Sequence, residues 1–398
     1  MLQEHEIFMY ISRWAFMGGA PGLQVYKFNT ETGAITFLKD ITTEISFGFS
    51  RVDEERGIIY LVNEMPEVPG VIYKTGRIYG YQLDKETGDA AELFHQETYC
   101  PFPSYIGMSA DKNYIVVPHH SWADNITTVV KNGDGIYEPM MQFNDSCVNL
   151  YTMNADGTLG QLVDVKKHSF DTPHFDFAGK LTIPHPHSAV LSPSGKFFAV
   201  CDKGDGHIYF YTINEEANEL ELLARHQTDA DLSEPRYCVF HPTKPFIYVN
   251  HEHTADGSMP VNAYRYTEEG GLEFINKVDA LYAPCHPADG KKALTSLSIS
   301  NDGQYLYCVA NGCNNVGVFS INQETGAVTL IQNQPINGKK ARNGALSPDG
   351  KYFITACILD GEIDVFAVGE DGMLTPTEHH AKAHGAAYIS FYDPRKTK

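Results

Sequence analysis

Histidines occur in three short clusters that could carry acid–base or metal chemistry. Two imidazoles flank a proline in His185-Pro-His187, two are adjacent in His119-His120, and two alternate in His251-Glu-His253. An imidazole exchanges a proton near neutral pH and is also a common metal ligand. Alternating residues of a strand point to the same side, so the last pair could share a face. Because the sequence has no HExxH motif and no compact set of three ligands, we expect proton transfer here and predict neither a metal nor another cofactor.

The His185-Pro-His187 cluster stands at the entrance of a strand–turn–strand pattern. Ser188–Ser192 is a short apolar run suited to a buried strand, Pro193-Ser-Gly-Lys196 is a turn, and Phe197–Cys201 is a second strand. The apolar–turn–apolar pattern recurs roughly every 45–65 residues, which is the range of propeller blades. The histidines do not recur with it, so the repeat is structural and the departures from it are candidates for function.

The turns and the two ends of the chain predict how the units close into a ring. Turns such as Asn29–Gly33 and Asp84–Gly88 are expected to join the third and fourth strands of a unit. The first unit starts at Ile7–Ile11 without an innermost strand, and the C-terminus offers a spare one, Ala387–Phe391. We therefore predict an all-β, seven-bladed β-propeller of four-stranded blades, a single domain over residues 1–398 whose first blade is completed by the C-terminal strand.

Two segments interrupt the repeat, at about residues 121–147 and 168–182. Long insertions in a propeller usually emerge from one face and often cover a binding site. We expect both to be loops or small additions to the ring rather than separate domains.

Composition limits the partners and the compartment. The net charge of −20 argues against nucleic-acid and anionic-membrane partners, because both attract basic surfaces. No stretch approaches the ~20 apolar residues of a membrane span, and the first residues do not have the pattern of a signal peptide. The eight cysteines form no CxxC pair, and several lie in apolar runs: Cys201, Cys238, Cys308 and Cys357. We therefore expect reduced, buried thiols in a cytoplasmic protein.

Several motifs resemble those of the seven-bladed-propeller lactonase family, which includes one class of 6-phosphogluconolactonase and a fungal carboxymuconate cyclase. The motifs are His185-Pro-His187-Ser-Ala-Val-Leu-Ser-Pro193, Pro235-Arg236-Tyr-Cys-Val-Phe-His-Pro242, Glu252 at the end of the following strand, and Arg342-Asn-Gly-Ala-Leu-Ser-Pro-Asp-Gly350. The resemblance covers nearly the whole chain. It implies an active site in the central channel, on a His, an Arg and a Glu that match His187, Arg236 and Glu252.

These three residue types form a minimal set for opening a lactone. His187 could activate water as the general base, and Glu252 could orient the imidazole or share its proton. Arg236 could bind an anionic substituent or the developing oxyanion. Two structural alternatives stay open: Arg236 could tie neighbouring blades together, and Glu252 could pair with it without taking part in chemistry.

Departures from the family pattern bear on the substrate. Where the resemblance implies a second Arg the chain has Asn311, and where it implies an Asn–aromatic pair the chain has His119-His120. One cation is lost and two imidazoles are gained, so we expect a neutral or singly charged lactone. Further substrate contacts are expected from residues near the same mouth of the channel: Glu64, His119, His120, His251, Asn311 and Arg342.

We therefore predict an enzyme of carbohydrate metabolism, a lactonase that hydrolyses a sugar-acid or related lactone. Its partner would be that small molecule, and the sequence leaves the oligomeric state open. A cyclase that runs the lactonising direction and a non-catalytic propeller that binds other proteins are the alternatives, because a fold does not fix a function.

Overall fold

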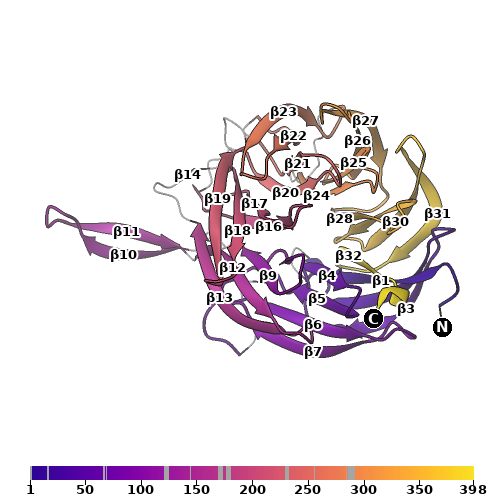
Figure 1. The fold of residues 1–398 in the computed structure, drawn as a ribbon, viewed down its shortest axis with the longest axis horizontal. Coiled ribbons are helices and arrows are strands. Elements are labelled where there is room, and N and C mark those ends of the chain that lie inside the picture. Colours follow the sequence, from indigo (N-terminus) through magenta and orange to yellow (C-terminus); the bar gives the residue numbers. More distant parts are fainter. Residues whose placement is uncertain are drawn as a thin grey trace.

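The computed structural model describes residues 2–15, 18–65, 68, 70–120, 125–143, 145–168, 174–175, 181–228, 233–254, 256–283, 285 and 292–398. In this part of the chain, seven four-stranded antiparallel sheets stand around a central axis as the blades of a propeller (Figure 1). The predicted fold class is confirmed. Pro394–Lys396 forms a short 3₁₀ turn, and no helix among the described residues is long and apolar enough to cross a membrane.

The blades follow one another in chain order, each built from the innermost strand outward. Blade one consists of β32 (Ala386–Tyr392), β1 (Glu6–Arg13), β2 (Gly22–Asn29) and β3 (Ile35–Thr42). Blade two consists of β4 (Phe49–Asp53), β5 (Ile58–Val62), β6 (Arg77–Leu83) and β7 (Ala90–Glu97). Blade three consists of β8 (Gly107–Met108), β9 (Tyr114–His119), β12 (Ser146–Met153) and β13 (Leu159–His168). Blade four consists of β16 (Pro186–Leu191), β17 (Phe198–Asp202), β18 (His207–Asn214) and β19 (Glu219–Gln227). Blade five consists of β20 (Pro235–Phe240), β21 (Phe246–His251), β22 (Pro260–Tyr266) and β23 (Leu272–Asp279). Blade six consists of β24 (Ala293–Ile299), β25 (Tyr305–Asn311), β26 (Asn315–Ile321) and β27 (Val328–Pro335). Blade seven consists of β28 (Ala341–Leu346), β29 (Tyr352–Cys357), β30 (Glu362–Val368) and β31 (Leu374–Lys382).

The ring closes as the sequence predicted. Strand β32 pairs antiparallel with β1, with Ile11 opposite Ile389, and the two ends of the chain lie near each other (Figure 1). Both residues belong to an apolar cluster that also contains side chains of blade seven, such as Ile354 and Val365. The last strand therefore joins the first blade to the last through the core as well as through the sheet.

The second strand of a blade is buried on both faces because neighbouring blades pack against it. All five residues of β5 are buried, whereas the outermost strand β7 is largely exposed or half-buried. Tyrosines of these second strands also reach the next blade: the hydroxyl groups of Tyr10 and Tyr60 donate to the carbonyl oxygens of Gly88 and Gly157 at 2.8 Å. Continuous apolar runs of this kind are the sequence signal of fully buried strands.

Both predicted insertions contain small additions to the ring. The first contains a hairpin of β10 (Asn125–Lys131) and β11 (Tyr137–Phe143), which projects away from the blades (Figure 1). The second contains the short strands β14 (His174–Phe175) and β15 (Leu181–Thr182), which pair with each other. Other residues of the two insertions lie outside the described part of the chain.

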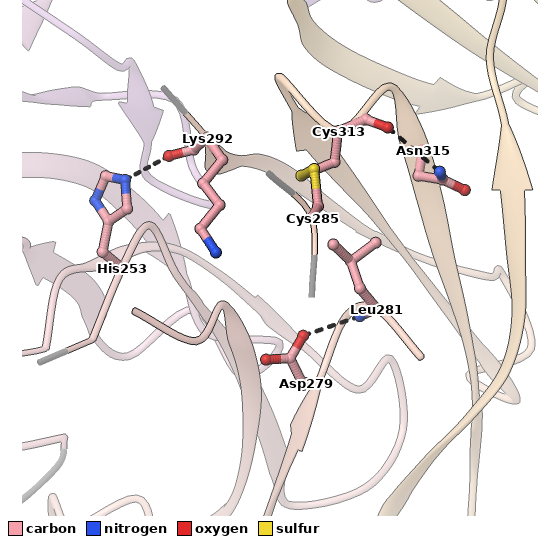
Figure 2. Close-up of a disulfide and its surroundings, with 7 residues drawn as sticks. All are labelled: His253, Asp279, Leu281, Cys285, Lys292, Cys313 and Asn315. Atoms are coloured by element: carbon pink, nitrogen blue, oxygen red, sulfur yellow. Dashed lines mark hydrogen bonds between the residues drawn. A yellow bond between two sulfur atoms is a disulfide. The ribbon is translucent and has the colours of Figure 1, made fainter. Parts of the chain in front are cut away.

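The prediction that all cysteines are reduced is wrong for two of them. Cys285 and Cys313 form a disulfide that joins the loop after β23 to the turn between β25 and β26 (Figure 2). Neither cysteine lies in an apolar run, and their separation of 28 residues carries no motif, so only the packing of adjacent segments brings them together. The other six cysteines are free and buried, as expected.

Candidate active site in the central channel

Two recurring positions in the blades place polar side chains near the central axis of the ring, where they are buried or half-buried. The first is a β-bulge near the start of the innermost strand, where the pairing register shifts by one residue. A bulged residue leaves the ladder and its side chain is re-aimed. In blades four to seven the bulged residues are His187, Arg236, Thr295 and Arg342, and all four are buried.

The second position lies one or two residues beyond the end of the second strand. In blades one to five it holds Trp14, Glu64, His120, Lys203 and Glu252. Because blades are arranged radially, inner-strand entries and second-strand ends of neighbouring blades meet near the axis on one face. The site is therefore a product of the repeat, with a different residue type supplied by each blade.

Glu64 is the centre of one half of the site. One of its oxygens, Oε2, accepts a hydrogen bond from Arg342, and the other, Oε1, lies 3.4 Å from Nε2 of His120. The Trp14 indole donates to the Glu64 carbonyl at 3.0 Å and stacks under the Arg342 guanidinium at 4.0 Å. Burial raises the pKa of Glu64, but Arg342 and His120 outweigh it and lower the pKa to about 2. Glu64 is therefore a fixed carboxylate at neutral pH.

Glu252 is the centre of the other half. Its Oε2 accepts a hydrogen bond from Arg236 and lies 2.8 Å from the Lys203 ammonium. Burial raises the pKa of Glu252, but the charges of Lys203 and Arg236 outweigh it and lower the pKa far below its usual value. Arg236 also lies over the ring of Tyr237, at 5.7 Å. This carboxylate holds two cations in place at the channel.

Three imidazoles lie between the two halves. The ring of His120 stacks between Phe102, at 4.9 Å, and His185, at 3.8 Å. The ring of His187 is nearly parallel to that of His120, at 5.6 Å, and meets the edge of Tyr237 at 5.1 Å. One ring nitrogen of His187 lies within 4.8 Å of both a Glu64 oxygen and a His120 nitrogen.

The imidazoles are neutral at physiological pH. Burial and then the charge of Arg236 lower the pKa of His187 well below its ordinary value. Burial also lowers the pKa of His185 and, against the opposing effect of Glu64, that of His120. A neutral imidazole has a free lone pair, so it can accept a proton in this site.

The formal charges of the site leave one positive charge, in a chain whose net charge is −20. Three cations (Lys203, Arg236 and Arg342) face two carboxylates (Glu64 and Glu252), and the imidazoles add none. Such a site attracts a single negative charge, whether it is carried by the substrate or develops during a reaction.

Most of the predicted site residues come together, and three stand apart. His187, Arg236, Glu252, Glu64, His120 and Arg342 lie in the cluster. His119 points elsewhere, because its Nδ1–H donates to the Val117 carbonyl at 3.0 Å. His251 is fully buried at the end of β21, opposite Pro235. Asn311 ends β25, and in the described part of the chain no hydrogen bond joins it to the charged residues of the site.

Sequence reasoning missed Lys203, His185 and Trp14 as members of the cluster. Lys203 follows the second strand of blade four as Glu252 follows that of blade five, and Trp14 has the same place in blade one. A residue-by-residue alignment of the second-strand ends would therefore have identified both. His185 was marked by the His185-Pro-His187 motif but was not named as a site residue, and its place in the cluster comes from stacking against His120 of blade three.

Comparison with known proteins places the chain in a described group. A family model described as "Lactonase, 7-bladed beta-propeller" matches residues 9–391. Among curated relatives, a 6-phosphogluconolactonase of Formosa agariphila is 23% identical over 96% of this chain and 99% of its own length. A 6-phosphogluconolactonase of Bacillus subtilis is 22% identical over 90% of each chain.

Solved structures share the fold over the full ring. A putative 6-phosphogluconolactonase from Bacteroides fragilis superimposes with a TM-score of 0.79, at 23% identity, over 99% of both chains. A periplasmic gluconolactonase from Pseudomonas aeruginosa gives a TM-score of 0.80, at 21% identity, over 97% of this chain and 99% of its own.

Proposed function

Since the chain belongs to the seven-bladed β-propeller lactonase family, we propose that it is a lactonase whose reaction takes place at the cluster of His187, Arg236 and Glu252. The observation that carries the proposal is a buried, neutral imidazole, His187, which lies near the Glu64 carboxylate and is exposed to the charge of Arg236. Lactone hydrolysis needs a base for water and a positive group for the oxyanion, and this arrangement supplies both.

In the proposed reaction, His187 takes a proton from a water molecule as the water oxygen attacks the lactone carbonyl carbon. The carbonyl π electrons move to oxygen, and Arg236 or Lys203 stabilises the resulting oxyanion. When the ring C–O bond breaks, the protonated His187 returns its proton to the leaving alkoxide, and the product is the open hydroxy acid. Glu64, within 4.8 Å of His187, orients the ring or the water.

Glu252 has a different role from the one expected from its type. Its oxygen is shared by Arg236 and Lys203, and its lowered pKa makes it a poor proton carrier. We assign it to holding the two cations at the reacting carbonyl, with His187 as the only proton carrier of the three. Of the two structural alternatives left open by the sequence, the pairing of Glu252 with Arg236 is present, and in the proposed mechanism that pair serves the chemistry instead of standing apart from it.

The substrate proposed is a neutral or singly charged sugar lactone. The site has one formal positive charge in excess, which matches the oxyanion or one carboxylate but leaves a phosphate dianion only partly neutralised. The chain has Asn311 where the family resemblance implied a second Arg. Lys203 supplies a cation to the site instead, and it is already included in the count of charges above. A lactone without phosphate should therefore be hydrolysed with a higher kcat/KM than its 6-phosphorylated form.

The cytoplasmic location also stays a proposal. Six buried free thiols fit a reducing compartment, whereas a disulfide such as Cys285–Cys313 is typical of oxidising ones. Alkylation of the freshly isolated protein followed by mass spectrometry tests the point: alkylated Cys285 and Cys313 support the cytoplasm, and a protected pair contradicts it.

The enzyme proposal is tested with a panel of sugar lactones, phosphorylated and unphosphorylated, on the wild type and on His187→Ala. Loss of a general base typically costs ~10²–10⁴-fold in rate, so the variant should lose measurable turnover and keep its melting temperature. His380→Ala is the control, because His380 is exposed on the outermost strand β31. A wild type without turnover on every lactone, or a His187→Ala variant with full turnover, would contradict the proposal.

A further inference from the structure

Glu64, His120 and His187 form a ligand set that the lactonase mechanism does not need in full. A carboxylate oxygen of Glu64 and one nitrogen from each ring all lie within 4.8 Å of one another, and all three residues are buried. Two imidazoles and one carboxylate suit first-row divalent metals such as Zn²⁺, whereas Ca²⁺ and Mg²⁺ prefer oxygen ligands. The residue types therefore point to the zinc class.

The separation of two of these atoms fits a bound ion better than a direct hydrogen bond. Glu64 Oε1 and His120 Nε2 are 3.4 Å apart, which is long for a hydrogen bond to a carboxylate. Neighbouring ligands at ~2.1 Å from a tetrahedral ion lie about 3.4 Å from each other. The third ligand atom, on His187, needs only a small side-chain movement to complete the set.

Two of the three ligands, Glu64 and His120, are already held in position. Arg342 binds the other oxygen of Glu64, Oε2, so Oε1 stays directed at His120 without being used by the cation. The ring of His120 is fixed between Phe102 and His185. Metal sites commonly use outer groups of this kind to orient their ligands.

A second observation concerns hydrogen bonds that two of the imidazoles do not make. The buried Nδ1 atoms of His120 and His187 have no hydrogen-bond partner among the described residues. Buried polar atoms are nearly always paired, so each exception calls for an explanation. Because Nδ1 has no partner, the His120 proton can move there and leave the lone pair of Nε2 for an ion, and His187 likewise has a ring nitrogen free of protein contacts.

The second group of possible ligands in the described residues, Glu234, Glu252 and His253, does not meet these conditions. Glu252 is engaged by two cations, and one ring nitrogen of His253 binds Glu234. The other ring nitrogen of His253 donates to the Lys292 carbonyl (Figure 2). These contacts use the atoms that an ion would need.

We propose that Glu64, His120 and His187 bind a divalent ion of the zinc class, and that the bound ion blocks lactone hydrolysis. The block follows because the ion occupies the lone pair with which His187 takes a proton from water. Binding stands on the ligand geometry alone, whereas the block rests on the proposed function. The three cations nearby oppose a further positive charge, so the ion binds reversibly and chelation leaves turnover intact.

Binding is tested by titrating metal-free protein with Co²⁺, whose visible absorption reports the nitrogen and oxygen ligands independently of activity. We expect one equivalent bound by the wild type. The variant His120→Phe keeps the aromatic stack but removes one ligand, and it should weaken binding by at least ~10-fold. His119→Gln is the matched control, since its neighbouring ring points away from the set, and it should bind as the wild type does.

Inhibition is tested on the same samples with Zn²⁺ and the best lactone of the panel. Zn²⁺ should stop turnover of the wild type, EDTA should restore it, and His120→Phe should require at least ~10-fold more Zn²⁺ relative to its own metal-free rate. Absence of Co²⁺ binding up to millimolar concentration, or binding unaffected by His120→Phe, would overturn the site. Binding that raises turnover would overturn the block and the role of His187 as base, and would leave the site itself standing.

Discussion

Replacing Arg236 with glutamine should move the acid limb of the pH–rate profile to higher pH. In the wild type, burial and the positive charge of Arg236 hold the pKa of His187 well below 6.5. The base is lost only when His187 is protonated, so kcat/KM should stay level from neutral pH down to well below pH 6.5. Removing the cation lets the pKa of His187 rise, and the loss of activity should begin at higher pH.

The size of the shift follows from the geometry around Tyr237. His187 and Arg236 contact the same tyrosine, with separations of 5.1 Å and 5.7 Å from its ring. Two unit charges at ~8 Å interact by ~2 kcal/mol at an effective dielectric constant of ~20, so loss of the Arg236 charge should raise the pKa of His187 and move the midpoint of the acid limb measurably to higher pH. Glu252 keeps Lys203 as a partner in this variant, so the buried carboxylate is not left unpaired.

The assay measures acid release by pH-stat between pH 4 and 7.5 under kcat/KM conditions, with subtraction of the spontaneous hydrolysis of the lactone. The shape of this profile reports the pKa of the free enzyme's essential base. Arg265→Gln is the matched control. Arg265 belongs to β22, the third strand of blade five, and its guanidinium lies over the ring of Phe246 instead of in the His187 cluster. An acid limb near pH 6.5 in the wild type, or the same midpoint in wild type and Arg236→Gln, would refute the reasoning.

Three further predictions follow from single contacts. Deleting residues 386–398 removes β32, whose large buried side chains contribute ~1.5–3 kcal/mol each, against a total free energy of unfolding of ~5–15 kcal/mol. Thermal circular dichroism of the truncated chain should therefore show no cooperative transition. A melting temperature near that of the full chain would contradict ring closure. Gly48→Ala should lower kcat/KM, because the new Cβ would lie 2.1 Å from Glu64 Oε2 and displace it from its arginine, whereas Gly133→Ala, with open space around it, should not. Arg236→Lys should raise KM more than it lowers kcat, since lysine lacks the planar fork; steady-state kinetics with an unchanged KM would count against a binding role.

The fold could be predicted because its signals are local and repeated. Each blade carries its own apolar run, turn and hairpin, and the same pattern recurs with only two insertions. Ring closure could be predicted as well, because the first unit lacks an innermost strand and the C-terminal segment contains one strand more than the seventh unit needs. Such agreement between local pattern and global fold is what makes a sequence specify one structure.

The site could be predicted only where a motif marked it. His187 and Arg236 were found because they stand just before or within a recognisable strand, and the bulges that direct them inward have no sequence signal of their own. Of the two partners of Glu252, Arg236 was anticipated, whereas Lys203 was missed because it comes from another blade and carries no motif of its own. The disulfide could not be predicted either, because Cys285 lies in an irregular loop that no sequence pattern places beside Cys313.

The pairing of β1 with β32 also sets the order in which the chain can mature on the ribosome. Residues 6–13 leave the ribosome well before their partner, 386–392, is made. At ~5–20 residues per second, the apolar edge of β1 waits roughly 20–75 s for its neighbouring strand. An unpaired, apolar strand edge is a site of association between nascent chains. The step most exposed to chaperones and to aggregation is therefore the wait of the first blade for its last strand, and slower translation of the distal blades should lower the soluble yield of a protein whose finished ring is fully closed.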